Sequence, residues 1–291
     1  MSETVRISKR LQQSPEEIVQ SLQELPSAAA ILPKLLTILN EPSASMEDVV
    51  SLIKLEPGTA ARVLQMGNSA YYSHSGRCSS LEEGVNRIGF LKIYEVVAYA
   101  VTSDLLLREL PAYGIDAEEL WLRSVGCAIA SALLAPACDL DVDGAYTTGL
   151  FHAVGLVGID AWLRANASSA TLDYVDFLHE TTAAERQLLG VTNAAVAAAL
   201  LKRWTFKSTI REAVFWQYSP NARGAHRRAA SLVHVAKWIQ AKARSRPLAK
   251  PVPQPDPAVF AEIRLPKADI DKRIAEVGAE LERIRLMLAE H

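Results

Sequence analysis

With 291 residues, 49% of them hydrophobic and 22% charged, the chain has the composition of a globular protein rather than a disordered one. Its formal net charge of −2 provides no overall attraction to nucleic acid or to an anionic membrane. The three cysteines form no CxxC pair, and the N-terminal residues lack the apolar core of a signal peptide, so we expect a cytoplasmic protein with reduced thiols. No uncharged run reaches the roughly 18 residues of a membrane span, so we expect no membrane partner.

The first third of the chain carries many helix signals and almost no strand signals. Capping boxes at Ser14 and Ser45 predict two helix starts, because each serine is followed three residues later by an acidic side chain. Pro57 is placed to open another helix, which should end near Asn68. An aromatic loop follows, and a serine at residues 79–80 then caps a short helix.

A long helix predicted over residues 91–107 is followed by an interruption at residues 109–114. Proline and glycine punctuate this interruption, which makes it the best candidate for a boundary between two helical subdomains. Asp116 is placed to cap the next helix. We therefore divide this region into an N-terminal helical part, 1–110, and a second helical part, 111–246.

The centre of the second part is an apolar segment, residues 150–159, that carries no charge. Its apolar side chains cover every face of a helical wheel, which predicts one continuous helix in the middle of a bundle. Gly155 and Gly158 each cost roughly 1 kcal/mol relative to Ala in a helix interior, so we expect neighbouring helices to approach closely there. One imidazole, His152, lies in this segment. It is either a metal ligand or general base, or a hydrogen-bonded core histidine.

The rest of the chain is also predicted to be helical. The predicted helices cover residues 172–179, 182–189, 193–203, 210–218 and 222–243. Five prolines make residues 247–257 a semi-rigid extended linker. The C-terminal segment, 258–291, contains a strongly amphipathic helix over residues 268–289. This last helix either packs back on the bundle or docks on a partner.

Two groups of motifs resemble known proteins. Residues 149–155, Gly-Leu-Phe-His-Ala-Val-Gly, resemble the signature helix of the HD superfamily of metal-dependent phosphohydrolases, in which an adjacent His and Asp bind metal. The Asn-Ser-Ala-Tyr loop at 68–71 and the serine-capped helix ending at Gly89 resemble the HDOD (HD-related output domain) family. The order of segments matches from about residue 20 to 246. This resemblance implies an all-α, multi-helix bundle of HD-like type, with the HD-like subdomain following the N-terminal helical one.

The resemblance allows the HD metal-ligand pattern to be carried over position by position. The degenerate metal-site positions are Arg123, His152, Ala153, Asn193 and Lys237. Residues 217–218, Gln-Tyr, stand where some relatives have paired histidines. Of the five, His152 alone retains a ligand side chain, because a methyl group cannot coordinate a metal and an arginine, with a pKa above ~12, repels a cation. Divalent metals in hydrolases need several His or carboxylate ligands. We therefore expect no metal, no other cofactor, no catalytic residue and no enzyme activity.

Two surfaces are candidates for binding. The aromatic loop offers Tyr71, Tyr72 and His74, of the kind that anchor protein interfaces. Residues 201–250 contain twelve Lys or Arg residues against one acid, Glu212, which is +11 locally and leaves −13 for the remaining chain. Arg223, Arg227 and Arg228 in this basic segment are candidates for binding an anionic ligand, either nucleic acid or a cyclic nucleotide. The alternative is a solvated face whose charges pair with acids such as those at residues 139–143.

These observations favour a catalytically inactive regulatory protein of bacterial signal transduction that acts through protein contacts, a role that the HDOD resemblance implies. One alternative is a metal-dependent phosphohydrolase with a degenerate site, acting on a cyclic nucleotide or another phosphoester. A second alternative is an anion- or nucleic-acid-binding module that uses the basic segment 201–250. The sequence leaves the partner protein and the oligomeric state open.

Overall fold

The computed structural model is described over residues 11–22, 29, 31–69, 71–72, 77–89, 92–167, 170–172, 179–221, 224–244 and 252–289. Two candidate site residues, His74 and Arg223, lie outside these ranges, as does most of the helix predicted over 172–179. Within the described ranges every regular element is a helix, and extended backbone pairs at a single bridge between Leu110 and Ile115. The predicted all-α fold is confirmed.

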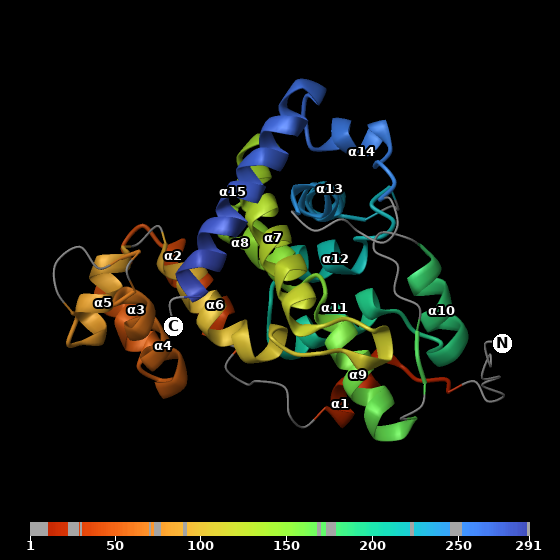
Figure 1. The fold of residues 1–291 in the computed structure, drawn as a ribbon, viewed down its shortest axis with the longest axis horizontal. Coiled ribbons are helices and arrows are strands. Elements are labelled where there is room, and N and C mark those ends of the chain that lie inside the picture. The colour runs from red at the N-terminus through yellow and green to blue at the C-terminus, as the bar shows by residue number, and fades with distance from the viewer. Residues whose placement is uncertain are drawn as a thin grey trace.

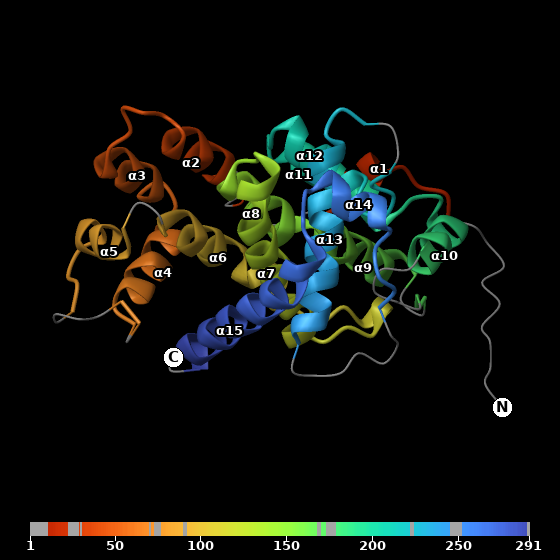
Figure 2. The same cartoon turned by 90° about the horizontal axis from the view of Figure 1, so that it is seen from above.

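Five N-terminal helices form one end of the molecule (Figures 1 and 2). They are α2 (Ile31–Leu39), α3 (Met46–Ile53), α4 (Pro57–Gly67), α5 (Leu81–Ile88) and α6 (Ile93–Leu106). Ser45 closes a capping box at the start of α3, and Ser80 caps α5, as the sequence predicts. The predicted box at Ser14 also forms and begins α1 (Pro15–Ser21), which packs against α9 and α11 at the opposite end.

Most of the remaining helices surround a central group. That group consists of α7 (Ala117–Leu134), α8 (Val142–Phe151) and α13 (Arg227–Ala243), which contact one another. Around it lie α9 (Val154–Asn166), α10 (His179–Leu189), α11 (Asn193–Arg203) and α12 (Ser208–Phe215). One described stretch, 117–138, has the length and hydropathy of a membrane span, yet 72% of its 18-residue window is buried inside the bundle. Burial of that kind is typical of the core helix of a soluble protein.

The apolar segment at the centre is not one helix, and the predicted continuous helix through residues 150–159 is wrong. The chain turns at His152 and Ala153, between α8 and α9. In a continuous helix the His152 carbonyl would accept the Leu156 amide. Here the Leu156 amide donates to Ala153 at 3.0 Å, and the His152 carbonyl instead accepts the side-chain amide of Gln217 at 2.9 Å. A side chain from a distant segment therefore interrupts the helix.

Close helix approach at the two glycines is as predicted. A Cβ on Gly155 would collide with the Asn193 carbonyl oxygen and would lie 2.8 Å from the Ala197 amide nitrogen, both on α11. A Cβ on Gly158 would lie 2.9 Å from Val196, also on α11. The absence of side chains at these two positions allows α9 and α11 to pack with their backbones nearly in contact.

The segment at 109–114 is firmly attached to the second helical part. It contains the short 3-10 turn η2 (Pro111–Tyr113) and the bridge between residues 110 and 115. The Ala112 amide donates to the buried carboxylate of Asp160 on α9 at 2.9 Å, and the Ala112 carbonyl accepts the Leu172 amide at 2.6 Å. These bonds fix the path of the chain as it leaves α6 for α7.

The C-terminal segment folds back across the bundle. The 3-10 turn η3 (Ala135–Cys138) follows α7. The 3-10 turn η4 (Lys267–Asp269) joins α14 (Pro257–Glu262) to α15 (Ile270–Ala289). Before α14, Val252 in the proline-rich linker is buried in the core. Helix α15 contacts α7 and α13 and buries Val277 and Leu281. The amphipathic helix therefore packs on its own bundle, and its far end reaches toward α4 and α6.

Candidate functional site

Three of the degenerate metal-site positions meet around residues 217–218, directly after α12. The Gln217 side chain donates from Nε2 to the His152 carbonyl oxygen and accepts at Oε1 from Lys237 Nζ at 3.0 Å. The Tyr218 ring lies against the Lys237 ammonium, 3.8 Å from Nζ to the ring centroid. The Tyr218 hydroxyl also donates to Asn193 Oδ1 at 3.2 Å. His152, Asn193 and Lys237 thus belong to one buried polar network.

Lys237 brings a positive charge into the centre of this network. Its side chain extends from α13, and the residue is 2% exposed. Burying an ammonium group costs several kcal/mol unless it is compensated. The bond to Gln217 and the face of the Tyr218 ring provide a charge-assisted hydrogen bond and a cation–π contact. A lysine held at this position repels any metal cation that approaches.

His152 is bonded to the backbone of the turn that contains it. Its Nδ1 lies 2.7 Å from the Gly149 carbonyl oxygen, and the residue is 4% exposed. Because a carbonyl oxygen can only accept, the contact assigns the proton to Nδ1 in this tautomer. Ala153 beside it is 2% exposed and packs in the core. This bond holds the ring as in a hydrogen-bonded core histidine, and it would equally orient the Nε2 of a metal ligand.

Asn193 is held by a buried carboxylate, Glu185, that sequence patterns do not single out. Glu185 on α10 accepts the Asn193 backbone amide at 2.7 Å and its side-chain Nδ2 at 2.9 Å. The same carboxylate accepts the Tyr113 hydroxyl at 2.9 Å, which ties η2 to α10 and α11. Burial raises the pKa of Glu185 to about 7. A turn separates Glu185 from Asn193, so the spacing between them predicts no contact and only the folded chain shows the pair.

Arg123, at the first ligand position, makes an ion pair within its own helix. On α7 its Nε and Nη2 both contact the Glu119 carboxylate at 2.5 Å. Arg244, at the end of α13, contacts the same carboxylate oxygen. One carboxylate therefore bridges two guanidinium groups whose side chains are nine-tenths or more buried. Sequence reasoning missed Glu119 as the partner, although the four-residue spacing to Arg123 is a known helix pairing.

The side chains at these positions do not fit a divalent metal. Within the described parts of the chain, no three or more His, Cys, Asp or Glu residues gather as a ligand group. Charged arginine and lysine have no lone pair to offer a metal, and the buried ammonium of Lys237 would repel a cation placed beside it. Of the five positions that the resemblance implies, His152, Asn193 and Lys237 meet in one network, whereas Arg123 pairs with Glu119 and Ala153 packs in the core.

The aromatic loop lies elsewhere, where the two helical parts meet the end of α15. Tyr71 is 37% exposed and packs edge-to-face on Tyr72, with ring centroids 4.6 Å apart. Tyr72 is half-buried against the core, and burial raises its pKa to about 12. Arg283 of α15 donates to the Tyr71 hydroxyl at 2.6 Å. Tyr71 is thus the more accessible of the two candidates.

Many basic side chains of segment 201–250 contact other residues of this chain. Its members with internal partners are Arg203, Arg227, Arg228, Lys237, Lys242 and Arg244. Arg227 pairs with Glu262 at 2.6 Å, and Arg228 lies 3.9 Å from Asp139. These pairings agree with the alternative in which the basic charges meet acids of the same chain.

With this geometry established, comparison with known proteins identifies the family. A family model described as the HDOD domain matches residues 25–220, which is more than half of the chain. The chain belongs to the HDOD family. The N-terminal helices α2–α6 fall inside the matched HDOD region, as do His152, Asn193 and residues 217–218 of the network, whereas Lys237 and the helices α13 to α15 follow it.

Solved structures share the fold of this HDOD protein at 22–23% sequence identity. One is an HDOD domain protein of unknown function from Geobacter sulfurreducens, with 22% identity, a TM-score of 0.66, and coverage of 92% of this chain and 96% of that one. Another, provisionally named a signal transduction protein, is from Marinobacter aquaeolei VT8, with 23% identity, a TM-score of 0.71, and coverage of 96% and 62%. A third, provisionally named a phosphohydrolase, is from Shewanella amazonensis SB2B, with 22% identity, a TM-score of 0.63, and coverage of 94% and 98%.

A curated relative extends beyond the present chain. An uncharacterized protein from Treponema pallidum (strain Nichols) is 22% identical over 200 residues. The match covers 66% of this chain but only 37% of the relative. HDOD membership thus establishes the fold and the family, and the chemistry of this chain has to be argued from its own residues.

Proposed function

We propose that this HDOD protein is a non-catalytic regulator of bacterial signal transduction that works through protein contacts. The observation that supports this most is the buried Lys237 ammonium, bonded to Gln217 and stacked on Tyr218 at the degenerate metal site. A site that contains its own positive charge has no need of a metal ion and resists binding one. The relative from Marinobacter that is provisionally named a signal transduction protein points in the same direction.

The competing function is metal-dependent phosphoester hydrolysis, which the provisional name of the Shewanella neighbour suggests for that protein. It would require several His or carboxylate ligands around the metal. In this chain Arg123, Ala153 and Lys237 occupy three of the ligand positions that the resemblance implies, and none of the three offers a lone pair as a charged or methyl side chain. We therefore place hydrolysis second.

Elemental analysis and a hydrolysis assay decide between the two functions. The purified protein should contain no stoichiometric Mn, Fe or Zn, and it should leave cyclic dinucleotides and bis(p-nitrophenyl) phosphate intact when Mn²⁺ is added. Lys237→Met, which removes the internal cation, serves as a matched variant and should not gain activity. One equivalent of metal in the wild-type protein, lost together with hydrolysis in a folded His152→Ala variant, would establish the enzyme instead.

The surface that makes protein contacts is proposed to include the aromatic loop at Tyr71 and Tyr72. Tyr71 is open to solvent, whereas Tyr72 contributes to packing, so Tyr71→Ala is the sharper test. We expect Tyr71→Ala to reduce capture of a specific partner in an affinity pull-down while the melting temperature changes little. Phe215→Ala, which alters another exposed aromatic residue far from the loop in sequence, is the matched control. Equal loss of capture in both variants would argue against the loop.

A further inference from the structure

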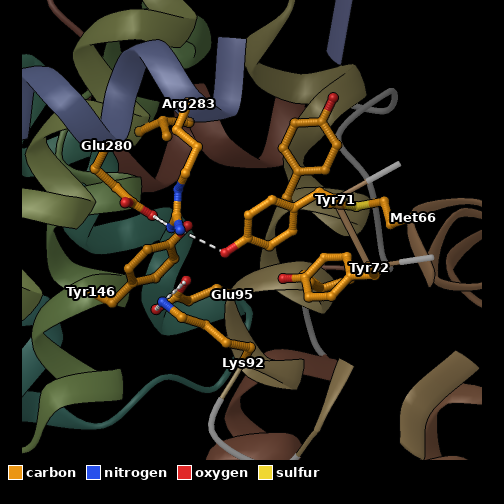
Figure 3. A pocket seen from close by; sticks show the side chains of 11 residues that line it. Met66, Tyr71, Tyr72, Lys92, Glu95, Tyr146, Glu280 and Arg283 are labelled. Atoms are coloured by element: carbon orange, nitrogen blue, oxygen red, sulfur yellow. Dashed lines mark hydrogen bonds and ion pairs between the residues drawn. The ribbon is translucent and has the colours of Figure 1, made fainter. Parts of the chain in front are cut away.

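A tyrosine-lined pocket lies where the N-terminal helices, the central helices and α15 meet. With Arg283 in place about 50 Å³ of it is accessible, and its walls include Tyr71, Tyr72, Tyr99 and Tyr146. Figure 3 shows Arg283 pointing from α15 into this space, between Tyr71 and Tyr146. The pocket therefore draws on the aromatic loop, α6, α8 and α15, segments far apart in the sequence.

The group now inside the pocket is a guanidinium supplied by the chain itself. Arg283 donates from Nη1 to the Tyr71 hydroxyl at 2.6 Å, and its Cζ lies 4.8 Å from the Tyr71 ring centroid. Glu280, one turn earlier on α15, pairs with the same guanidinium. Aromatic faces and a carboxylate are the surroundings that a planar cation prefers.

Without Arg283, the charges around the pocket favour a cation. Lys92 and Glu95 neutralise each other through an ion pair of 2.8 Å. Glu280 and Arg283 form the second pair. If Arg283 leaves, the lining retains one positive and two negative groups, and the extra carboxylate lies beside several neutral tyrosine rings. The pocket is therefore complementary to a cation rather than to an anion such as a nucleotide.

The contact between Arg283 and Glu280 is weak enough for another guanidinium to take the place of Arg283. Its side chain is 44% exposed and that of Glu280 is 27% exposed. Ion pairs with this degree of exposure contribute little to stability. The buried anchors of α15, Val277 and Leu281, lie earlier in the helix and do not depend on this contact. Another guanidinium could replace Arg283 without unfolding the helix.

We propose that this pocket recognises an arginine side chain on a protein partner, and that Arg283 of α15 is its internal competitor. The inference rests on the proposed function in one respect, that the protein works through protein contacts. It assigns a chemistry to those contacts, in which a partner's guanidinium takes the place of Arg283 against Tyr71 and Glu280. The end of α15 then regulates access by competing for the same pocket.

Titration with a small probe tests the pocket directly. Nα-acetyl-L-arginine methylamide is titrated into the wild-type protein and the Arg283→Ala variant by calorimetry. Binding should be about tenfold tighter in the variant, the factor expected when Arg283 leaves the pocket open in about one molecule in ten. Arg273→Ala is the matched control, because Arg273 makes a similar i,i+3 ion pair with Glu276 on the same helix. It should bind the probe as the wild type does.

Two further arms show whether charge and the aromatic face are responsible. Nα-acetyl-citrulline methylamide, which has a similar shape but no charge, should not bind the Arg283→Ala variant. Tyr71→Ala combined with Arg283→Ala should lose the gain in affinity. Equal affinity in wild type and Arg283→Ala, or equal binding of the citrulline probe, overturns the proposal. Arg283→Gln provides a second variant if Arg283→Ala is poorly folded. These outcomes are independent of the metal and hydrolysis assays, so failure here is distinguishable from failure of the proposed function.

Discussion

Replacing Gly155 with alanine should destabilise this protein strongly. In an unconstrained helix interior the same change is worth roughly 1 kcal/mol of stabilisation. Here the new methyl group would collide with the Asn193 carbonyl oxygen and lie 2.7 Å from the Asn193 carbonyl carbon. Both atoms belong to the backbone of α11, so the clash is relieved only by moving one helix away from the other. Overpacking costs about 1–3 kcal/mol or more, and a clash with backbone atoms belongs at the upper end of that range. Offset by the gain of roughly 1 kcal/mol, this leaves a net loss of about 2 kcal/mol in the free energy of unfolding.

A matched glycine gives the opposite expectation. Gly58 lies near the start of α4, and a Cβ built there has nothing within 4 Å. Gly58→Ala should therefore be neutral or stabilise the protein by up to about 1 kcal/mol. Urea unfolding followed by far-UV circular dichroism measures both variants, provided that the m-value is unchanged. If Gly155→Ala is as stable as the wild type, α9 and α11 do not approach as closely as described, and the position of Asn193 beside the turn at residues 152–153 is wrong.

Three other perturbations test other parts of the structure. Burial raises the pKa of Glu185 from its ordinary 4.5 to about 7, so between these pH values the folded state binds a proton that the unfolded state has lost. The free energy of unfolding should therefore fall by about 3 kcal/mol as pH rises from about 4.5 to 7. Glu185→Gln should remove that fall in urea titrations repeated across this pH range. Trp162→Ala removes a ring that is 6% exposed in α9 and should cost roughly 3–5 kcal/mol by the same assay, whereas a loss under about 1 kcal/mol would mean that the ring is not core. Arg227→Gln with Arg228→Gln should leave weak duplex DNA binding and its salt slope almost unchanged, because both side chains already contact acids of this chain, and a large loss in a salt-dependent shift assay would revive the anion-binding function.

Sequence alone determines the features of this fold that depend on neighbours along the chain. The caps at Ser14, Ser45 and Ser80 form where predicted, because each hydroxyl bonds an amide three residues later. Close packing at Gly155 and Gly158 can also be predicted from the sequence, because a glycine destabilises a helix interior unless a neighbour must approach closely there. The loss of ligand side chains at Arg123 and Ala153 is likewise a property of the residues themselves.

Tertiary structure alone decides what these residues do. The break between α8 and α9 arises because Gln217, 65 residues beyond His152, binds its carbonyl oxygen. The buried charge of Lys237 is tolerated because the amide of Gln217 and the ring of Tyr218, which follow α12, lie beside it. Arg283 reaches Tyr71 across 212 residues of sequence. No sequence pattern predicts such contacts. Each partner comes within reach only when the whole bundle packs, and it is that contact which stabilises the side chain.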